Sequence, residues 1–351
     1  MGIEDILRQL TRMEVSDIFL VAGRPISYKM NREIRTLGEE RLTPALLEEY
    51  IRDIYRLAGE REEKGLLKTG DDDFSFALQG LARFRVSTFR QRGSLAAVIR
   101  VIAFKLPNAS ELGIPDSVIH MGDYGKGLVL VTGSAGSGKS TTLACIIDYI
   151  NHSKEKHIIT LEDPLEFLHS HDKSIVTQRE ISSDTESYIK ALRAAMRQSP
   201  DVILLGEMRD YETIQVAMTA AETGHLIFST LHTMGAANTI DRIIDVFPAN
   251  QQRQIAVQLS MVLQAVVSQQ LVPGTDGRMI PVFEIMTVTP AIRNMIRENK
   301  SFQIDGLLYA SSSPQMTSTD SSLLQLYREG KIERETALAY AANPDMLARR
   351  L

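Results

Sequence analysis

One stretch of sequence decides the fold of this chain: Gly133-Ser134-Ala135-Gly136-Ser137-Gly138-Lys139-Ser140. Its spacing is G-x-x-x-x-G-K-S, and it connects the apolar run at residues 128–132 to a helical pattern that begins at Lys139. A glycine-rich loop between a strand and a helix is typical of a phosphate-binding loop, because backbone N–H groups and the helix N-terminus surround the phosphate oxygens. The sequence therefore predicts a nucleoside triphosphate site.

Three residues at the end of this loop have specific expected roles. Lys139 should reach the β- and γ-phosphates of ATP, Ser140 should supply an oxygen to Mg2+, and Thr141 completes the binding segment. The alternative is an ordinary glycine-rich turn, which the strand before the loop and the helix after it disfavour.

The sequence around the loop alternates between strands and helices. Apolar strands are expected at residues 128–131, 157–161, 202–205 and 225–231, with helices at residues 139–149, 185–198 and 212–223 between them. Such a pattern favours a parallel sheet covered by helices on both faces. Helices are also expected at residues 250–271 and 290–300 and over the last 30 residues, with a mobile Ser/Thr-rich connection at residues 311–322.

The N-terminal part of the chain has a different pattern. Helical spacing is expected at Ile3–Arg12 and Pro44–Leu57, and short strands at Asp17–Val21 and Ser27–Met30. A hairpin at residues 81–90 and 95–102 follows, with its turn at residues 91–94. We predict an α+β domain at residues 1–103, a linker at residues 104–125 and the phosphate-binding domain at residues 126–351.

Composition excludes several classes of protein. A length of 351 residues exceeds one ordinary domain, and 44% hydrophobic with 24% charged residues is typical of globular proteins. A net charge of −5 offers no general attraction to nucleic acid, and the single cysteine, Cys145, allows no intrachain disulfide and no four-cysteine zinc site. The mixed charges of the first 17 residues do not indicate a signal peptide, and Gln and Ser interrupt the apolar stretch 255–272, so we expect no membrane span.

Acidic residues follow two of the predicted strands. Glu162, Asp163 and Glu166 come after residues 158–161, and Glu207 comes after residues 202–205 with Gly206 between. Ligands of open α/β sheets bind at the carboxyl ends of the strands, where such groups can hold a metal or orient water. Gly206 stands where most phosphate-loop enzymes have the acid itself, which indicates a subfamily.

Two histidines flank the strand at residues 226–231. His225 and His232 are seven residues apart, so an unbroken strand projects them to opposite faces and they do not share one ion. We expect His232 to sense the γ-phosphate, whereas for His225 a nucleotide contact and a structural hydrogen bond both stay open. His169 and His171 lie in a polar loop and are expected at the surface.

The hairpin places two arginines opposite each other. If Gln91 and Ser94 close the turn, Arg85 pairs with Arg100, and Arg83 shares their face. Like charges facing across strands are destabilising, which favours an anion between the arginines; the alternatives are that both are solvated or that acids such as Asp71–Asp73 neutralise them. Acting across a subunit boundary, they would be arginine fingers for a bound nucleotide.

At this point the motifs resemble those of the type IV pilus retraction ATPases, PilT-like proteins of the type II/IV secretion ATPase superfamily. The resemblance covers essentially the whole chain, and the segments that carry it are SDIFLVAGRP, ARFRVSTF, the phosphate loop, ITLEDPLEF, ILLGEMRD, ETGHLIFSTLHT and RIIDVFP. A further segment discriminates between motors: Ala291-Ile292-Arg293-Asn294-Met295-Ile296-Arg297-Glu298 is similar to the AIRNLIRE signature of retraction ATPases.

The resemblance implies a RecA-like P-loop ATPase domain preceded by a smaller α+β PAS-like domain, assembled into a homo-hexamer. It implies that Glu166 is the general base or positions water, that Glu207 is the Walker B acid near Mg2+, and that Arg85 and Arg100 reach a nucleotide in the neighbouring subunit. Arg293 and Arg297 lie four apart on one helical face, which could contact neighbouring subunits or a membrane platform, or could be a solvated surface.

The implied function is a hexameric motor that hydrolyses ATP to power pilus retraction and twitching motility. The resemblance places it in the cytoplasm at the inner face of the cytoplasmic membrane, acting on an inner-membrane platform protein and indirectly on pilin, without nucleic acid or zinc. Alternatives are a pilus extension or type II secretion motor, a RecA-like DNA motor, and a scaffold that binds nucleotide without hydrolysing it.

Overall fold

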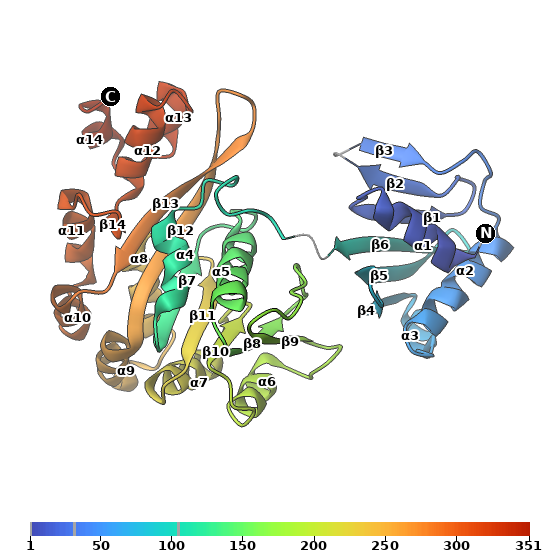
Figure 1. Ribbon diagram of the computed structural model, residues 1–351, viewed down its shortest axis with the longest axis horizontal. Coiled ribbons are helices and arrows are strands. Elements are labelled where there is room, and N and C mark those ends of the chain that lie inside the picture. Colours follow the sequence, from blue (N-terminus) through green and yellow to red (C-terminus); the bar gives the residue numbers. More distant parts are fainter. Residues whose placement is uncertain (1, 31–32, 104–105) are drawn as a thin grey trace. The chain divides into compact units, whose positions relative to one another are not determined.

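The structure is a computed structural model that describes residues 2–30, 33–103 and 106–351. The chain divides into two compact units (Figure 1): Met1–Lys105 with Glu166–Leu168, and Leu106–Leu165 with His169–Leu351. Each unit has its own sheet and its own buried core.

The first unit is built on a six-stranded antiparallel sheet in the order β3-β2-β1-β6-β5-β4. Its elements along the chain are α1 (Ile3–Arg12), β1 (Asp17–Val21), β2 (Ser27–Met30), β3 (Glu33–Thr36), α2 (Pro44–Leu57), α3 (Lys64–Thr69), β4 (Asp71–Leu78), β5 (Ala82–Gln91) and β6 (Ser94–Ala103). The sequence analysis did not predict β3, α3 or β4. All residues of β3 are exposed, so no apolar alternation marks this strand, and β4 begins with three aspartates.

Apolar residues at helical spacing attach α1 and α2 to one face of this sheet. Ile6 and Leu10 of α1 are fully buried, as is Ile51 of α2, and they share a core with Leu20 of β1 and Ile99 of β6. The α2 helix begins at Pro44 because the preceding Thr43 side chain accepts a hydrogen bond from the N–H of Leu46. Because the helices cover one face of the sheet, Arg85 of β5 and Arg100 of β6 lie on the other face.

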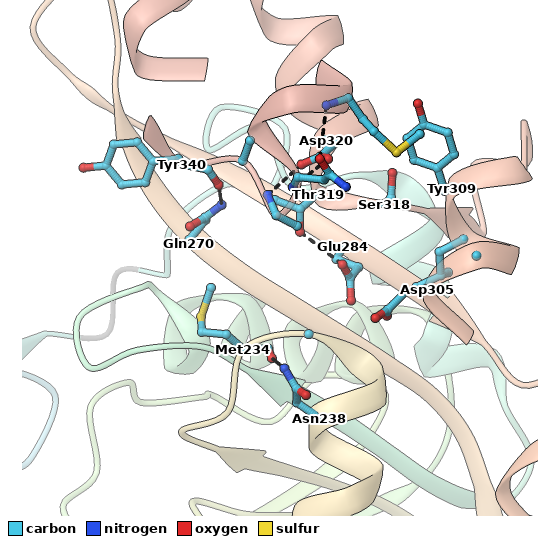
Figure 2. A pocket seen from close by; sticks show the side chains of 17 residues that line it. Met234, Asn238, Gln270, Glu284, Asp305, Tyr309, Ser318, Thr319, Asp320 and Tyr340 are labelled. Atoms are coloured by element: carbon cyan, nitrogen blue, oxygen red, sulfur yellow. Dashed lines mark hydrogen bonds between the residues drawn. The ribbon is translucent and has the colours of Figure 1, made fainter. Parts of the chain in front are cut away.

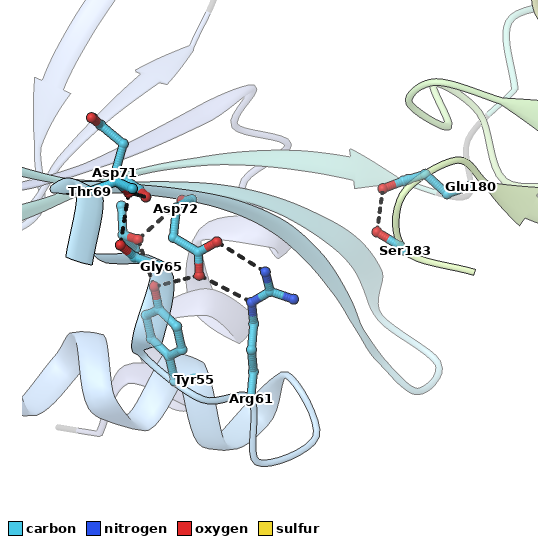
Figure 3. A network of polar contacts seen from close by, with 9 residues as sticks. Tyr55, Arg61, Gly65, Thr69, Asp71, Asp72, Glu180 and Ser183 are labelled. Atoms are coloured by element: carbon cyan, nitrogen blue, oxygen red, sulfur yellow. Dashed lines mark hydrogen bonds and ion pairs between the residues drawn. The ribbon is translucent and has the colours of Figure 1, made fainter. Parts of the chain in front are cut away.

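A polar network links α2 to β4 within the first unit (Figure 3). Tyr55 Oη donates to Asp72 Oδ2 at 2.9 Å, and Arg61 donates to both carboxylate oxygens of Asp72 at 3.0 and 3.1 Å. Burial raises the pKa of Tyr55 to about 12, so its hydroxyl stays a donor at neutral pH. Asp72 is therefore committed to Arg61, and not to the arginines of the hairpin.

The second unit is built on an eight-stranded sheet in the order β14-β13-β12-β7-β11-β10-β8-β9. Strands β12 through β9 in this order run parallel, whereas β13 and β14 are antiparallel to their neighbours. Its elements along the chain are α4 (Asp116–Ile119), the 3-10 helix η1 (His120–Asp123), β7 (Gly127–Thr132), α5 (Lys139–Ser153), β8 (His157–Glu162), β9 (Ile175–Glu180), α6 (Tyr188–Ala195), β10 (Val202–Leu205), α7 (Tyr211–Glu222), β11 (Leu226–Leu231), α8 (Ala236–Asp245), α9 (Ala249–Val262), β12 (Leu263–Pro273), β13 (Met279–Thr287), α10 (Pro290–Arg297), the 3-10 helix η2 (Ser301–Gln303), α11 (Ile304–Ala310), β14 (Met316–Thr317), α12 (Thr319–Arg328), α13 (Arg334–Ala339) and α14 (Pro344–Ala348).

Both faces of this sheet are covered by helices. Leu128 and Leu130 of β7 belong to a core with α6, α7, α8 and α9, whereas Val129 and Val131 belong to a second core with α4 and α5. Because every residue of β7 and β10 is buried, on both faces of the sheet, these strands are almost continuously apolar. The predicted α/β class, with a smaller α+β unit before it, is confirmed.

The expectation of one helix at residues 250–271 is wrong. The α9 helix ends at Val262, and β12 continues from Leu263 to Pro273 between β7 and β13. The β-branched pair Val266 and Val267, buried in different cores on the two faces, fits a central strand better than a helix. Gln264 and Gln270 occupy partly exposed positions of this strand. These polar residues interrupt its apolar pattern, so the sequence did not indicate a strand.

The segment expected to be a linker is part of the second unit where the structure describes it, which is from residue 106 onward; residues 104–105 lie outside the described residues. It contains α4 and η1, and Ile114, Val118 and Met121 are buried in the core beside α5. Likewise, residues 311–322 include β14 and the first turn of α12. Within the described residues, no helix combines the length and apolarity that a membrane crossing requires.

Candidate functional site

The predicted phosphate loop begins where β7 ends, at the carboxyl edge of the parallel sheet. Thr132, the last residue of β7, pairs with Leu231 of β11 and Ser268 of β12. The chain then turns through Gly133 (φ 141°), Gly136 (φ 76°) and Gly138 (φ 90°), and α5 starts at Lys139. All three glycines have φ values that side chains rarely adopt, which explains the glycines of the motif.

The loop is a close-fitting cradle. A Cβ atom on Gly133 would lie 2.1 Å from the backbone oxygen of Gln269, and one on Gly138 would lie 2.8 Å from the Gln269 side-chain nitrogen. Ser137 is buried inside the loop, and its Oγ has no hydrogen-bond partner among the described residues. Both observations fit a loop whose shape and donors are completed by a phosphate group.

Lys139 lies across its own loop. Its ammonium group donates to the carbonyl oxygens of Gly133 at 2.9 Å and Ser134 at 2.8 Å, and the residue is only 8% exposed. Ser140 and Thr141, the next two residues of α5, are half-buried. The positive charge is therefore held at the loop, where the sequence predicted it.

A cavity of about 740 Å³ opens beside the loop and was not predicted from the sequence. Gly138, Thr141 and Thr142 line one end of this loop cavity. Its other walls come from residues 110–114, 269–281 and 326–331, and they include Leu112, Ile114, Leu271, Ile280, Pro281 and Arg278. A volume of this size with apolar walls and a few polar groups is typical of a site for a small ligand. Because its walls come from four separate segments, no local motif could have identified it.

Glu207 lies at the same edge of the sheet, just after β10. Gly206 precedes it because the Tyr188 hydroxyl would lie 2.8 Å from a Cβ atom there, and the Gly206 N–H continues the ladder to Leu161. This close approach explains the glycine that displaces the acid by one position. Burial raises the pKa of Tyr188, as do the carboxylates of Glu207, Asp163 and Glu162, so its hydroxyl stays protonated beside them.

Glu207 and His232 lie close together, a contact that the sequence analysis did not predict. His232 Nε2 is 3.6 Å from Glu207 Oε2, and the other carboxylate oxygen forms an ion pair with Arg209. The hydrogen bond to Glu207 raises the pKa of Arg209. Together with Arg242 these residues line a pocket of about 300 Å³. Sequence reasoning missed Arg209 and Arg242, although Arg209 lies within the GEMRD segment.

The carboxylates after β8 are divided between the two units. Glu162 ends β8 and, with Asp163, belongs to the second unit, whereas Glu166 belongs with Phe167 and Leu168 to the first unit. Glu207 and His232, by contrast, follow β10 and β11, which lie in the same sheet as the strand before the phosphate loop. The role of Glu166 stays a prediction.

The structure does not bring His225 to the loop. His225 precedes β11 at the amino end of the strand, about 20 Å along the strand from its carboxyl end at ~3.3 Å per residue. Its Nδ1 lies 2.9 Å from the carbonyl oxygen of Ala220, near the C-terminus of α7. Of the two roles left open for His225, the observed contact is the structural hydrogen bond.

His169 differs from expectation. It is only 8% exposed, not at the surface, whereas His171 is exposed as predicted. Burial, with a smaller effect of nearby His152, lowers the pKa of His169 to about 4. The imidazole is therefore neutral at physiological pH.

In the first unit, the predicted pairing of the hairpin is confirmed. Gln91 pairs with Ser94, and Arg85 lies directly opposite Arg100. Arg100 Nε donates to Asp17 Oδ1 on the adjacent β1 at 3.1 Å, so Asp17 is the counter-ion that the sequence did not identify. The half-buried side chain of Arg85 has no hydrogen bond or ion pair within the described residues. Of the two facing arginines, Arg100 is therefore paired and Arg85 is available.

The AIRNMIRE segment forms α10, and its residues have different roles. Ile292 and Ile296 are buried, and Met295 packs against the same core. Arg293 donates to the carbonyl oxygens of Ser260 at 2.6 Å and Met261 at 3.0 Å. Ala291, Asn294, Arg297 and Glu298 are exposed. The two arginines of the motif are therefore not equivalent: Arg293 bonds within the chain and Arg297 faces solvent.

Comparisons with known proteins agree with these features. The family described as "Type II/IV secretion system protein" matches residues 3–328. The chain is 43% identical over 345 residues to the type IV pilus retraction ATPase PilT of Pseudomonas aeruginosa, covering 98% of this chain and 99% of that protein. It is 48% identical over 277 residues to a twitching motility protein of Neisseria gonorrhoeae, covering 79% of this chain and 74% of that protein.

A solved structure of the pilus retraction motor PilT with bound ADP matches with a TM-score of 0.89 and 44% identity over 99% of both chains. The likeness thus extends over both units and over the phosphate loop. The chain therefore belongs to the type II/IV secretion system protein family and is a P-loop ATPase of that family.

Proposed function

We propose that this chain is an ATP-hydrolysing motor that drives pilus retraction. The observation that carries the proposal is the phosphate loop, with Lys139 held across it, at the same sheet edge as Glu207 and His232. The 43% identity to a pilus retraction ATPase over nearly the full chain supports retraction as the work performed.

ATP would place its phosphates within the loop at residues 133–138 and its nucleoside in the loop cavity. Mg2+ would be held by Ser140 and Glu207, and when bound it would offset the negative charge of the phosphates. Ser140 is a half-buried hydroxyl at the start of α5 and Glu207 is a largely buried carboxylate, so both are oxygen donors suited to Mg2+.

Hydrolysis would then use three further groups. Glu166 would position the attacking water or accept its proton, and His232 would respond to the γ-phosphate from the end of β11. Arg209 forms an ion pair with Glu207 and would hold this carboxylate in position for the metal.

The working form would be a homo-hexamer in which Arg85 and Arg100 act on the nucleotide of a neighbouring subunit. The lack of any partner for Arg85 within the described chain supports this assignment. Rotation of the two units against each other would transmit the work to an inner-membrane platform protein, and so to pilin, from the cytoplasmic side.

The test compares wild type with Lys139→Ala. Calorimetry should show Mg-ATP binding by wild type and at least tenfold weaker binding by the variant, because the charge that meets the phosphates is gone. Tight ATP binding by Lys139→Ala would contradict the assignment of the loop.

The direction of the motor needs a separate measurement. Deletion of the gene in its own organism should give excess surface pili and no twitching, and Lys139→Ala should fail to restore twitching. Loss of pili after deletion would instead favour a pilus extension or secretion motor.

A further inference from the structure

Gln269 lies behind the phosphate loop, although no sequence motif indicated it. It belongs to β12, one residue beyond Ser268, which pairs with the last residue of β7. Its backbone oxygen is the atom that a Cβ on Gly133 would meet, and its side-chain nitrogen is the atom that a Cβ on Gly138 would meet. Gln269 therefore contacts both ends of the glycine-rich loop.

The side-chain amide of Gln269 has a fixed orientation. Thr142, on the first turn of α5, donates from Oγ1 to Gln269 Oε1 at 2.7 Å. Because Oε1 is held by Thr142, Nε2 is directed to the side of Gly138. The residue is only 3% exposed, so the orientation is not averaged by solvent.

The amide nitrogen of Gln269 carries two N–H donors. No acceptor for Gln269 Nε2 is found within the described residues, and Gln269 lines the loop cavity together with Gly138, Thr141 and Thr142. An amide N–H that reaches the cavity and has no acceptor among the described residues can donate to a ligand oxygen there.

We propose that Gln269 is a nucleotide-binding residue whose Nε2 donates to an oxygen of the nucleoside at the junction of the loop and the cavity. The inference rests on the proposed ATP site and adds a neutral donor from a strand outside the motif. Thr142 acts through Gln269 as its positioning residue.

The test uses two substitutions of similar size. Gln269→Glu keeps an acceptor for Thr142 but replaces the donor with an anionic oxygen, and Gln269→Met removes the donor without adding charge. Calorimetry should show the Kd for Mg-ATP raised at least tenfold by Gln269→Glu and about threefold to tenfold by Gln269→Met, since one hydrogen bond contributes about 0.5–1.5 kcal/mol.

Gln270→Glu is the matched control. Gln270 is the next residue of β12, and its Nε2 donates to the carbonyl oxygen of Tyr340 at 3.1 Å in a different cavity (Figure 2). The same charge change there should leave the Kd for ATP within twofold of wild type. Thermal unfolding of each variant shows whether the fold is retained.

Tripolyphosphate separates a direct contact from an effect on the loop. Because Nε2 lies at the cavity end, Gln269→Met should weaken ATP binding more than tripolyphosphate binding. Equal weakening of both ligands, or ATP binding by both Gln269 variants within twofold of wild type, would overturn the proposal. Failure of wild type to bind ATP would instead reject the proposed function.

Discussion

The site of this ATPase depends on single residues that other groups of the chain hold in place. Lys139 is held at the loop by two carbonyl oxygens, Glu207 is held between Arg209 and His232, and Tyr188 stays protonated beside three carboxylates. A buried group whose pKa differs between the folded and the unfolded chain makes stability depend on pH, and His169 is such a group.

His169 should make the second unit less stable as pH falls. Its pKa in the folded chain is about 4, below the ordinary 6.5, so between these values the unfolded chain binds a proton that the folded chain does not. The free energy of unfolding should fall by on the order of 2–3 kcal/mol from pH 7 to pH 4 through this residue. Urea unfolding of wild type and His169→Leu at several pH values measures the effect.

His171→Gln provides the control, because His171 is exposed and glutamine keeps an acceptor for the N–H of Val176. It should retain the wild-type dependence on pH, whereas His169→Leu should lose most of it. An unchanged slope in His169→Leu would assign the pH dependence to other groups.

At the scale of elements, α10 shows how a motif divides into structural and exposed parts. Arg293 supplies donors to the carbonyl oxygens that end α9, where helices leave such groups without partners and where positive charge is favourable. Arg297, four residues later, makes no comparable contact in the described chain and is exposed.

Arg293→Gln should therefore destabilise the chain by about 1–2 kcal/mol, since charged hydrogen bonds to the end of a helix are lost. Arg297→Gln should change the free energy of unfolding by less than about 0.5 kcal/mol. Chemical unfolding of the two variants side by side gives the comparison. Equal destabilisation by both would mean that the contact to α9 is not what Arg293 contributes.

Some strands could be predicted from their own sequence, whereas others are defined by the strands that pair with them. The strands β7, β8, β10 and β11 were predictable because they are largely buried on both faces and so are mostly apolar. By contrast, β12 was taken for helix, because its identity as a strand comes from β7 and β13 on either side of it. The same strand brings Gln269 to the loop, so this error also concealed part of the site.

The parts of the candidate site that lie within one short segment of sequence were predictable, and the other parts were not. The phosphate loop and Glu207 follow directly from short motifs, and the pairing of Arg85 with Arg100 follows from hairpin register. The loop cavity and the Asp17 partner of Arg100 come from distant segments, and no spacing in the sequence encodes them.

At the scale of the whole molecule, the assignment of Arg85 to a neighbouring nucleotide can be tested by mixing subunits. Arg85→Ala and Lys139→Ala should each be inactive as pure proteins. If Arg85 acts between subunits, a mixture of the two variants should regain ATPase activity at interfaces that combine an intact loop with an intact arginine, about a quarter of sites in a random equal mixture.

Subunit exchange must be verified by size-exclusion chromatography with one variant labelled. Absence of any recovered activity in demonstrably mixed rings would mean that Arg85 acts within its own chain. Substantial ATPase activity of Arg85→Ala by itself would remove the arginine from the reaction altogether.

The position of Lys139 also has a consequence for ligand selection. Two carbonyl oxygens of the loop already occupy its ammonium group, so any anion must compete with the protein's own acceptors. A lone inorganic phosphate offers few additional contacts to outweigh them, whereas a triphosphate spans the loop and carries more charge. The two carbonyl oxygens on Lys139 thus compete with inorganic phosphate more effectively than with ATP. The loop should therefore prefer ATP even where free phosphate is abundant.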